Sequence, residues 1–147
     1  MDFDDKRTLF WKKFIRYANI QPNSSVGDEI DLEAFSRDHA IQIFAKNDFR
    51  LMVGVNRTYF RCSLHLTGEN ISKFSPKIKK DNNEFVKMIR FSRDPVFRIK
   101  ENDSSIVLML RDYGFIFPPK NNYEGKVSIE WLYRNATVFN NYMEKLI

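Results

Sequence analysis

Apolar and polar side chains alternate in three short runs between residues 39 and 66, and turns rich in Asn and Asp or Thr separate the runs. Alternation of this kind, built from β-branched and aromatic residues, is typical of strands covered on one face. We therefore expect an antiparallel meander. Its apolar positions are Ile41 and Ile43 in the first strand, Leu51, Val53 and Val55 in the second, and Phe60, Cys62 and Leu64 in the third.

The alternation also predicts how the strands pair, because a shift by one residue would turn every side chain to the other face. A two-residue turn at 57–58 places three apolar pairs side by side. These pairs are Val55 with Phe60, Val53 with Cys62, and Leu51 with Leu64. A three-residue turn at 46–48 would bring Ile43 beside Leu51 and Ile41 beside Val53.

The opposite face of the meander carries a mixture of basic, aromatic and small side chains. Two interpretations stay open: the closing helix covers this face with Trp131, Tyr133 and Tyr142, or the face is open to a partner. An open face could stack a flat base and bind phosphate groups. The candidate ligand or partner residues are Phe44, Arg50, Tyr59, Arg61 and His65, with Gln42, Met52, Gly54, Asn56 and Ser63 between them.

Helical spacing of apolar residues predicts helices on both sides of the meander. An amphipathic helix is expected over residues 4–18, with aspartates near its start. Ser75 and Pro76 resemble a helix cap followed by proline in the first turn. They predict a basic helical region to about residue 90, which residues 81–83 could interrupt.

The last third of the chain predicts a hairpin and a closing helix. The hairpin consists of residues 96–100 and 105–110, and its second strand is apolar on both faces, which is typical of a central strand. Residues 114–117 could add a short edge strand. Ser128 is expected to cap a final helix with apolar residues at helical spacing.

The order of these elements predicts one α+β domain over residues 1–147. We expect an antiparallel sheet of five to six strands, a meander plus a hairpin. The N-terminal, middle and C-terminal helices would pack mainly on one face. No internal repeat or low-complexity segment suggests a second domain.

Positive charge is concentrated in one segment. The chain has a net charge of +5, and residues 73–100 contain nine basic side chains against three acidic ones. Such asymmetry indicates an anionic partner, although a solvated lysine-rich helix is the simpler alternative. The candidate nucleic-acid-binding residues are Lys73, Lys77, Lys79, Lys80, Lys87, Arg90 and Arg93.

No pattern in the sequence identifies a reaction, so we expect a non-enzymatic protein without a cofactor or bound metal. Cys62 and His65 are three positions apart on one strand and should point to opposite faces. Glu33, Asp38 and His39 lack a recognised metal-ligand spacing. Asp94-Pro95 and Glu124-Gly125-Lys126 contain the letters of a nuclease motif, but Glu124 lies in a predicted loop rather than on a core strand.

The single cysteine and the absence of a secretory signal or long apolar run favour a cytoplasmic protein without membrane contact. The expected partner is nucleic acid or a protein that processes it. A small inhibitor or adaptor in phage–host conflict and a nucleotide-signal-binding domain are the alternatives. The sequence favours no particular oligomeric state.

Three motifs resemble an uncharacterised family of bacterial accessory domains, often found C-terminal to nuclease-like domains of the restriction type. The motifs are the aromatic helix from Phe10 to Tyr17, Ser36-Arg37-Asp38-His39 before the alternating strands, and Trp131-Leu132 followed by Ala136 and Phe139. The chain departs from the family at Ala40, where tryptophan is common, and at residues 88–91. The resemblance implies an accessory role near nucleic-acid enzymes or defence systems, and no catalytic residues.

Overall fold

A computed structural model describes residues 2–21, 40–46, 48–89 and 91–147. The side chains of Phe44, Lys46 and Asn70 are outside this description. The helices are α1 (Phe3–Ile20), α3 (Ile71–Lys80), α4 (Asn82–Met88) and α5 (Asn122–Leu146), with a short 3-10 turn, η1 (Gly68–Asn70), before α3. The strands are β1 (Ala40–Lys46), β2 (Phe49–Val55), β3 (Phe60–Thr67), β4 (Pro95–Glu101) and β5 (Ser105–Asp112).

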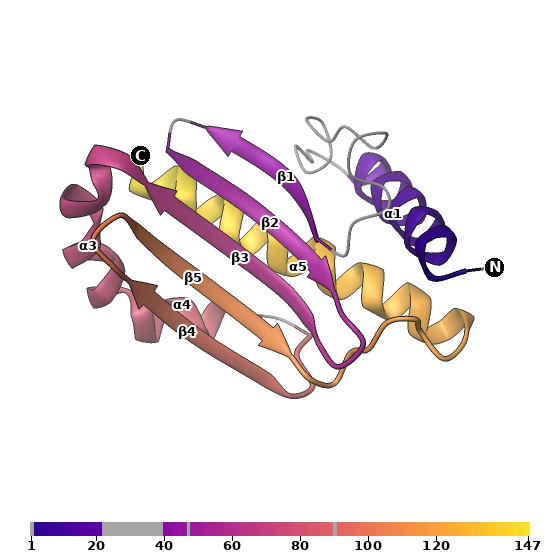
Figure 1. Cartoon of the computed structure of the whole chain (residues 1–147). Coiled ribbons are helices and arrows are strands. Elements are labelled where there is room, and N and C mark those ends of the chain that lie inside the picture. Colours follow the sequence, from indigo (N-terminus) through magenta and orange to yellow (C-terminus); the bar gives the residue numbers. More distant parts are fainter. Residues whose placement is uncertain (1, 22–39, 47, 90) are drawn as a thin grey trace.

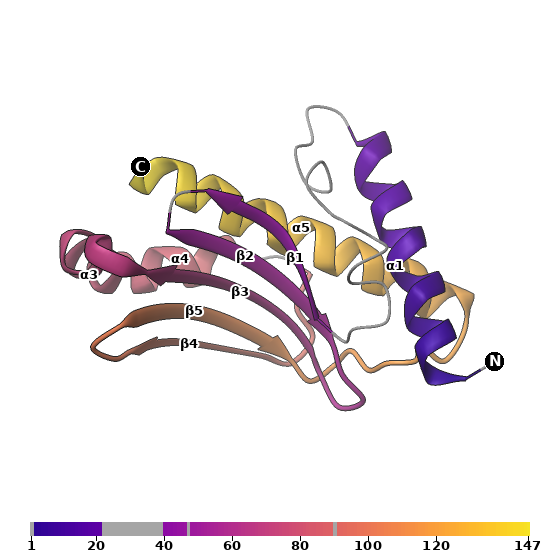
Figure 2. The same cartoon turned by 45° about the horizontal axis from the view of Figure 1, so that its top comes forward.

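The five strands form one antiparallel sheet in the order β1-β2-β3-β5-β4. Helices α3, α4 and α5 lie on the same side of this sheet, and α1 lies beside the first half of α5 (Figure 1). The turned view shows the same layers (Figure 2). This architecture confirms the expected α+β fold with helices mainly on one face. Among the described residues, no helix is both long and apolar enough to cross a bilayer.

The pairing of β2 with β3 confirms the predicted register. Val55 pairs with Phe60, Val53 with Cys62, and Leu51 with Leu64. All six are almost completely buried, so one face of this hairpin forms the core. The hairpin of β4 and β5 is also confirmed, and β5 lies inside the sheet between β3 and β4.

The first hairpin differs from the prediction. Ile41 pairs with Val53 as expected, but the register shifts between Gln42 and Phe44, so that Phe44 rather than Ile43 pairs with Leu51. Lys46 then pairs with Phe49, one position tighter than expected; Asn47 is outside the described residues. A bulge of this kind is common in edge strands, which β1 is. Ile43 remains buried despite the shift.

Two predicted helix starts are wrong. Helix α3 begins at Ile71, so Ser75 and Pro76 lie in its interior, and the Ser75 hydroxyl donates to Glu101 at 2.8 Å. The proline removes one backbone donor, but burial of Phe74 and Ile78 on the sheet anchors the helix on both sides of it. The interruption at 81–83 is confirmed because α4 starts anew at Asn82.

Helix α5 begins at Asn122 and not at Ser128. The Asn121 side chain accepts a hydrogen bond from the Glu124 N–H at 2.9 Å and caps the helix. Ser128 is an interior residue whose hydroxyl donates to the Glu124 carbonyl. The predicted edge strand at 114–117 is also absent. These residues form a loop whose Phe115 and Phe117 rings are buried in the core.

Aromatic rings join the helices to the sheet. The Phe85 ring of α4 lies 4.9 Å from Phe97 of β4, and it contacts Phe139 and Tyr142 of α5 at 4.8 and 4.9 Å. At the other end of α5, Trp131 contacts Phe60 and Phe115. Three of these five ring pairs are edge-to-face and two are tilted, and such aromatic packing adds to the burial of apolar area.

Replacement of Phe85 by alanine tests this packing. Removal of a ring that connects three elements leaves a cavity, so the variant should lose about 3 to 5 kcal/mol in free energy of unfolding. Urea denaturation monitored by circular dichroism measures the loss. Val86→Ala in the same helix is the control, because Val86 is 46% exposed and its removal should change little. Equal losses in the two variants would contradict the packing described here.

Candidate functional site

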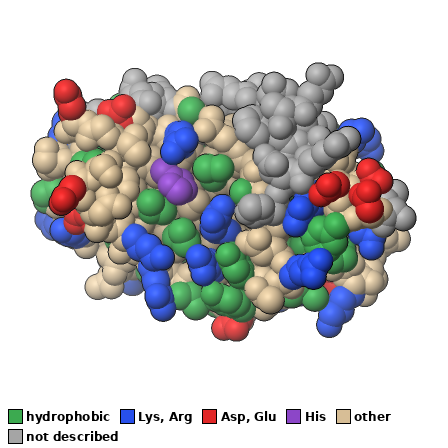
Figure 3. All heavy atoms as spheres, in the orientation of Figure 1, with side chains coloured by type: hydrophobic (Ala, Val, Ile, Leu, Met, Phe, Trp, Pro, Cys, Tyr) green, Lys and Arg blue, Asp and Glu red, His purple; other side chains and the backbone are tan. Residues whose placement is uncertain are grey.

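The sheet face opposite the helices is the largest polar surface that the described strands share. Side chains from four strands form aligned rows across it, because antiparallel partners point to the same face. Basic side chains lie among hydrophobic ones over the strands (Figure 3). The rows are Arg50, His65, Val107 and Lys100; Met52, Ser63, Met109 and Arg98; and Gly54, Arg61, Arg111 and Val96. We call this surface the open sheet face.

The open sheet face is electrostatically one-sided. The strands contain only two acidic residues, Glu101 and Asp112. Glu101 accepts hydrogen bonds from Ser75 and Lys79 of α3, on the helical side, and Asp112 is completely buried. Asp94, immediately before β4, is exposed near the end of the face. The five basic side chains of the face are Arg50, Arg61, Arg98, Lys100 and Arg111.

Two tyrosines extend the last row of the face. The Tyr59 and Tyr113 rings are 5.4 Å apart, and the Arg111 guanidinium lies 4.7 Å over the Tyr59 ring. A hydrogen bond with Tyr113 raises the pKa of Arg111 above its ordinary value. Arg111 is therefore held by an aromatic face on one side and a phenol oxygen on the other.

A buried carboxylate fixes the backbone on both sides of this cluster. Asp112 accepts hydrogen bonds from the N–H groups of Arg93, Asp94 and Gly114, each at 2.9 Å. Tyr113 follows Asp112 directly, and its own N–H donates to the Asp94 carbonyl. A side chain at Gly114 would place its Cβ 2.3 Å from the Arg93 Cβ, so only glycine fits there.

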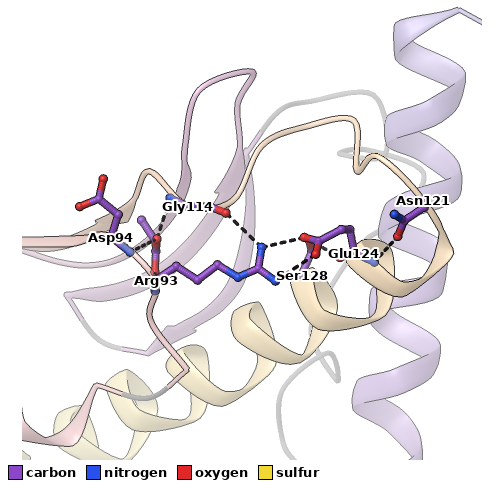
Figure 4. Close-up of polar contacts among 7 residues, drawn as sticks. Arg93, Asp94, Gly114, Asn121, Glu124 and Ser128 are labelled. Carbon is purple, nitrogen blue, oxygen red and sulfur yellow. Dashed lines mark hydrogen bonds and ion pairs between the residues drawn. The ribbon is translucent and has the colours of Figure 1, made fainter.

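Arg93 has a structural role. Its guanidinium donates to both carboxylate oxygens of Glu124 at 2.7 and 3.1 Å and to the Gly114 carbonyl (Figure 4). It also lies 4.4 Å over the Phe115 ring. The hydrogen bond with Glu124 raises the pKa of Arg93, and the same bond lowers the pKa of Glu124. Arg93 thus ties β4 to the first turn of α5.

The other predicted nucleic-acid-binding residues that the structure describes are on the helical side. Lys77 pairs with Asp81 at 3.1 Å, Lys79 with Glu101 at 2.6 Å, and Lys87 with Glu84 at 3.5 Å. These pairs are largely exposed, so each contributes little to stability. The remaining residues of the set are Lys73, which lies over the Phe74 ring, Lys80, which is exposed, and Arg90, which is outside the described residues.

Most of the predicted partner residues share one surface with one another, unlike the predicted nucleic-acid-binding residues. Arg50, Tyr59, Arg61 and His65 share the open sheet face, whereas the Phe44 side chain is outside the described residues. The sequence analysis missed Arg98, Lys100, Arg111 and Tyr113 as members of this site. Alternation in the second hairpin could have placed Arg98 and Lys100 on one face, but not beside β3.

The alternative in which the closing helix covers this face is wrong. Helix α5 packs on the opposite, apolar face, where Trp131 is fully buried against Phe60 and Phe115. The Tyr142 hydroxyl donates to Asp81 at 3.0 Å, and the Tyr133 ring packs on Tyr17 of α1. Trp131, Tyr133 and Tyr142 therefore make these contacts away from the open sheet face.

The described residues contain no group of three or more His, Cys, Asp or Glu side chains that could hold a metal ion. Burial raises the pKa of the Cys62 thiol, which keeps it protonated, and Cys62 points to the core while His65 is on the other face. The candidate ligands Glu33, Asp38 and His39 are outside the described residues.

A second feature is a groove between α1 and the start of α5. It has a volume of about 710 Å³ and is lined by apolar side chains including Leu9, with Lys6, Lys13 and Lys126 among its lining residues. Leu9 is 42% exposed. Neither of the two predicted sets of site residues lines this groove.

No protein-family model matches the chain, and no curated protein matches it. The resemblance to bacterial accessory domains therefore depends only on the motifs quoted from the sequence.

His65 is partly buried among the cations of this face. Its pKa is lowered by partial burial and by the nearby positive charges of Arg50 and Arg61. Its Nε2 is 3.0 Å from the Ser63 hydroxyl. Because the folded protein holds the imidazole neutral more strongly than the unfolded chain does, protonation opposes folding.

The stability contributed by neutral His65 should therefore be complete above the ordinary histidine pKa of about 6.5 and fall as the pH drops toward the lowered value. The measurement is the free energy of unfolding in urea from pH 8 to pH 5, for the native protein and His65→Gln. The difference between the two should shrink at low pH. His39→Gln removes the other histidine and is the control. A difference that does not change with pH would contradict this assignment.

Proposed function

We propose that the open sheet face binds single-stranded nucleic acid and that the protein catalyses no reaction on it. The observation that carries this proposal is the arrangement of five basic side chains and two tyrosines on one sheet face to which the strands contribute no acid. Arginine and lysine can bind phosphates, and tyrosine rings can stack unpaired bases.

The rigidity of the face supports this proposal. Its side chains project from strands that are packed against four helices, so binding does not have to order a flexible segment. Arg111 is held by two tyrosines before any ligand arrives. Preorganised contacts of this kind lose less conformational entropy on binding.

A single strand fits this surface better than a duplex. Tyr113 is 40% exposed, and hydrophobic side chains such as Met52 and Met109 lie between the cations. Unpaired bases can contact such side chains, whereas the bases of a duplex are stacked inside it. The lysines of α3 and α4 are on the other side of the sheet, and we assign them at most a non-specific contribution. Their exposed ion pairs are weak enough to exchange acidic partners for phosphate.

The resemblance to accessory domains fits this proposal, because a non-catalytic strand-binding domain could deliver nucleic acid to a nuclease. A role in defence against phage is part of the same proposal. A protein-interaction domain is the second candidate, and the groove beside Leu9 is the observation that favours it. In that case a partner protein captured by the chain would stay bound after nuclease treatment.

Charge reversal on the two sides of the sheet separates the candidate surfaces. Arg98→Glu with Lys100→Glu should weaken binding of a fluorescent ten-nucleotide single strand by at least about tenfold and reduce its salt dependence, because phosphate contacts release counterions. Fluorescence anisotropy at several salt concentrations measures both effects.

The matched control is Lys77→Glu with Lys80→Glu, which changes charge equally on α3. We expect this control to retain most of the affinity. Loss of binding only in the α3 variant would place the interface on the helical side instead. A wild-type protein that binds no single strand at low salt would refute the proposed function.

A further inference from the structure

A hollow on the open sheet face lies directly beside Arg111. Its volume is about 130 Å³, and its lining residues are Val96, Arg98, Lys100, Met109, Arg111 and Tyr113. An apolar cavity of about 150 Å³ accommodates one benzene ring. The hollow, which we call the β4–β5 hollow, is slightly smaller and is open to solvent, so a six-membered ring fits it more closely than a fused two-ring system does.

The lining of the β4–β5 hollow suits a planar ring. Val96 and Met109 provide apolar surface, and a methionine sulfur interacts favourably with aromatic rings. Tyr113 adds a partly exposed aromatic ring at one end. None of the six lining side chains is acidic.

Cations lie on both sides of this apolar surface. Arg111 lines one end, and Arg61 is its direct cross-strand partner on β3. Arg98 pairs with Met109, one row further along the sheet, which corresponds to about 7 Å along a strand. Consecutive phosphates of a single strand have a comparable separation, so both rows could hold neighbouring phosphates.

The pairing of Arg61 with Arg111 places two cations opposite each other, which favours binding of an anion. Like charges directly opposite each other destabilise a sheet. The Nε atoms of both side chains are buried and have no hydrogen-bond partner within the described part of the chain. Both side chains are nevertheless partly exposed. A phosphate bound at this row of the sheet would accept hydrogen bonds from both side chains.

We propose that the β4–β5 hollow holds one pyrimidine base of the bound strand and that Arg61 and Arg111 bind the phosphate beside it. This inference depends on the proposed function and adds a preference: strands of thymine, uracil or cytosine bind more tightly than strands of purines, whose two-ring bases fit the hollow less closely.

The test compares fluorescein-labelled dT10 and dA10 by fluorescence anisotropy. The wild-type protein should bind dT10 about tenfold more tightly, since stacking of one base contributes on that order. Val96→Trp fills the hollow and should reduce the affinity ratio of dT10 to dA10 toward one. Val107→Trp is the matched control, because Val107 is on the same face but does not line the hollow, and it should leave the ratio unchanged. The bases of dA10 stack on one another to the same extent with every protein variant. This effect therefore cancels when the affinity ratios of the variants are compared.

The phosphate part of the inference has its own test. Arg61→Lys with Arg111→Lys keeps the net charge but removes the planar, forked donors, and it should weaken binding of both oligonucleotides about tenfold. Arg134→Lys is the control, because Arg134 is an exposed residue of α5 that pairs with Glu130 on the helical side, and it should change affinity little. Thermal unfolding confirms that all variants fold.

Each outcome has a distinct meaning. An equal affinity ratio in Val96→Trp and Val107→Trp, or equal binding of dT10 and dA10 by the wild type, would overturn the base site. Unaltered binding by the double lysine variant would overturn the phosphate site. In these cases salt-dependent binding would still support the proposed function. Failure of the wild type to bind either strand would instead refute the proposed function and this inference together.

Discussion

Burial of one face of a single sheet under the described helices is the constraint from which the rest of the described structure follows. The alternating pattern of β2 and β3 sends large apolar residues such as Val53 and Phe60 to one side. Helix α5 crosses that side and buries Trp131 and Phe139 against it. Since a strand points its residues to two faces in turn, every arginine at the intervening positions has to project to the other side.

The elements that sequence could predict were those specified by local patterns. Alternation and a short turn were enough for the register of β2 and β3, whereas the bulge in β1 was missed because Ile41 and Ile43 fit a regular strand equally well. The start of α5 was missed because Asn121 and Ser128 are both good caps. Asn121 is the cap in the structure because the first helical turn is held in place by the pairing of Glu124 with Arg93, a residue distant in sequence.

The sequence predicted only part of the candidate site, because some of its residues come from strands that are distant in sequence. Arg50, Arg61 and His65 follow from the meander alone, but Arg111 reaches them through the pairing of β3 with β5, more than forty residues apart in the chain. No local pattern contains that pairing. The count of charges along the sequence grouped residues that the fold separates. It marked residues 73–100 as one basic segment, but the fold divides that segment between α3 and α4 on one side and Arg98 and Lys100 on the other.

The core and the open sheet face are connected through Asp112. Its side chain is buried and binds three backbone N–H groups, while its neighbours in sequence, Arg111 and Tyr113, belong to the surface. The carboxylate therefore fixes the turn that places Tyr113 beside Tyr59 and at the end of the β4–β5 hollow. Gly114 permits the close approach of Arg93, whose pairing with Glu124 ties the same turn to α5. A surface held in this way can present its cations and rings in one geometry, and selection of a single base requires such a fixed geometry because mobile side chains would adapt to any base equally.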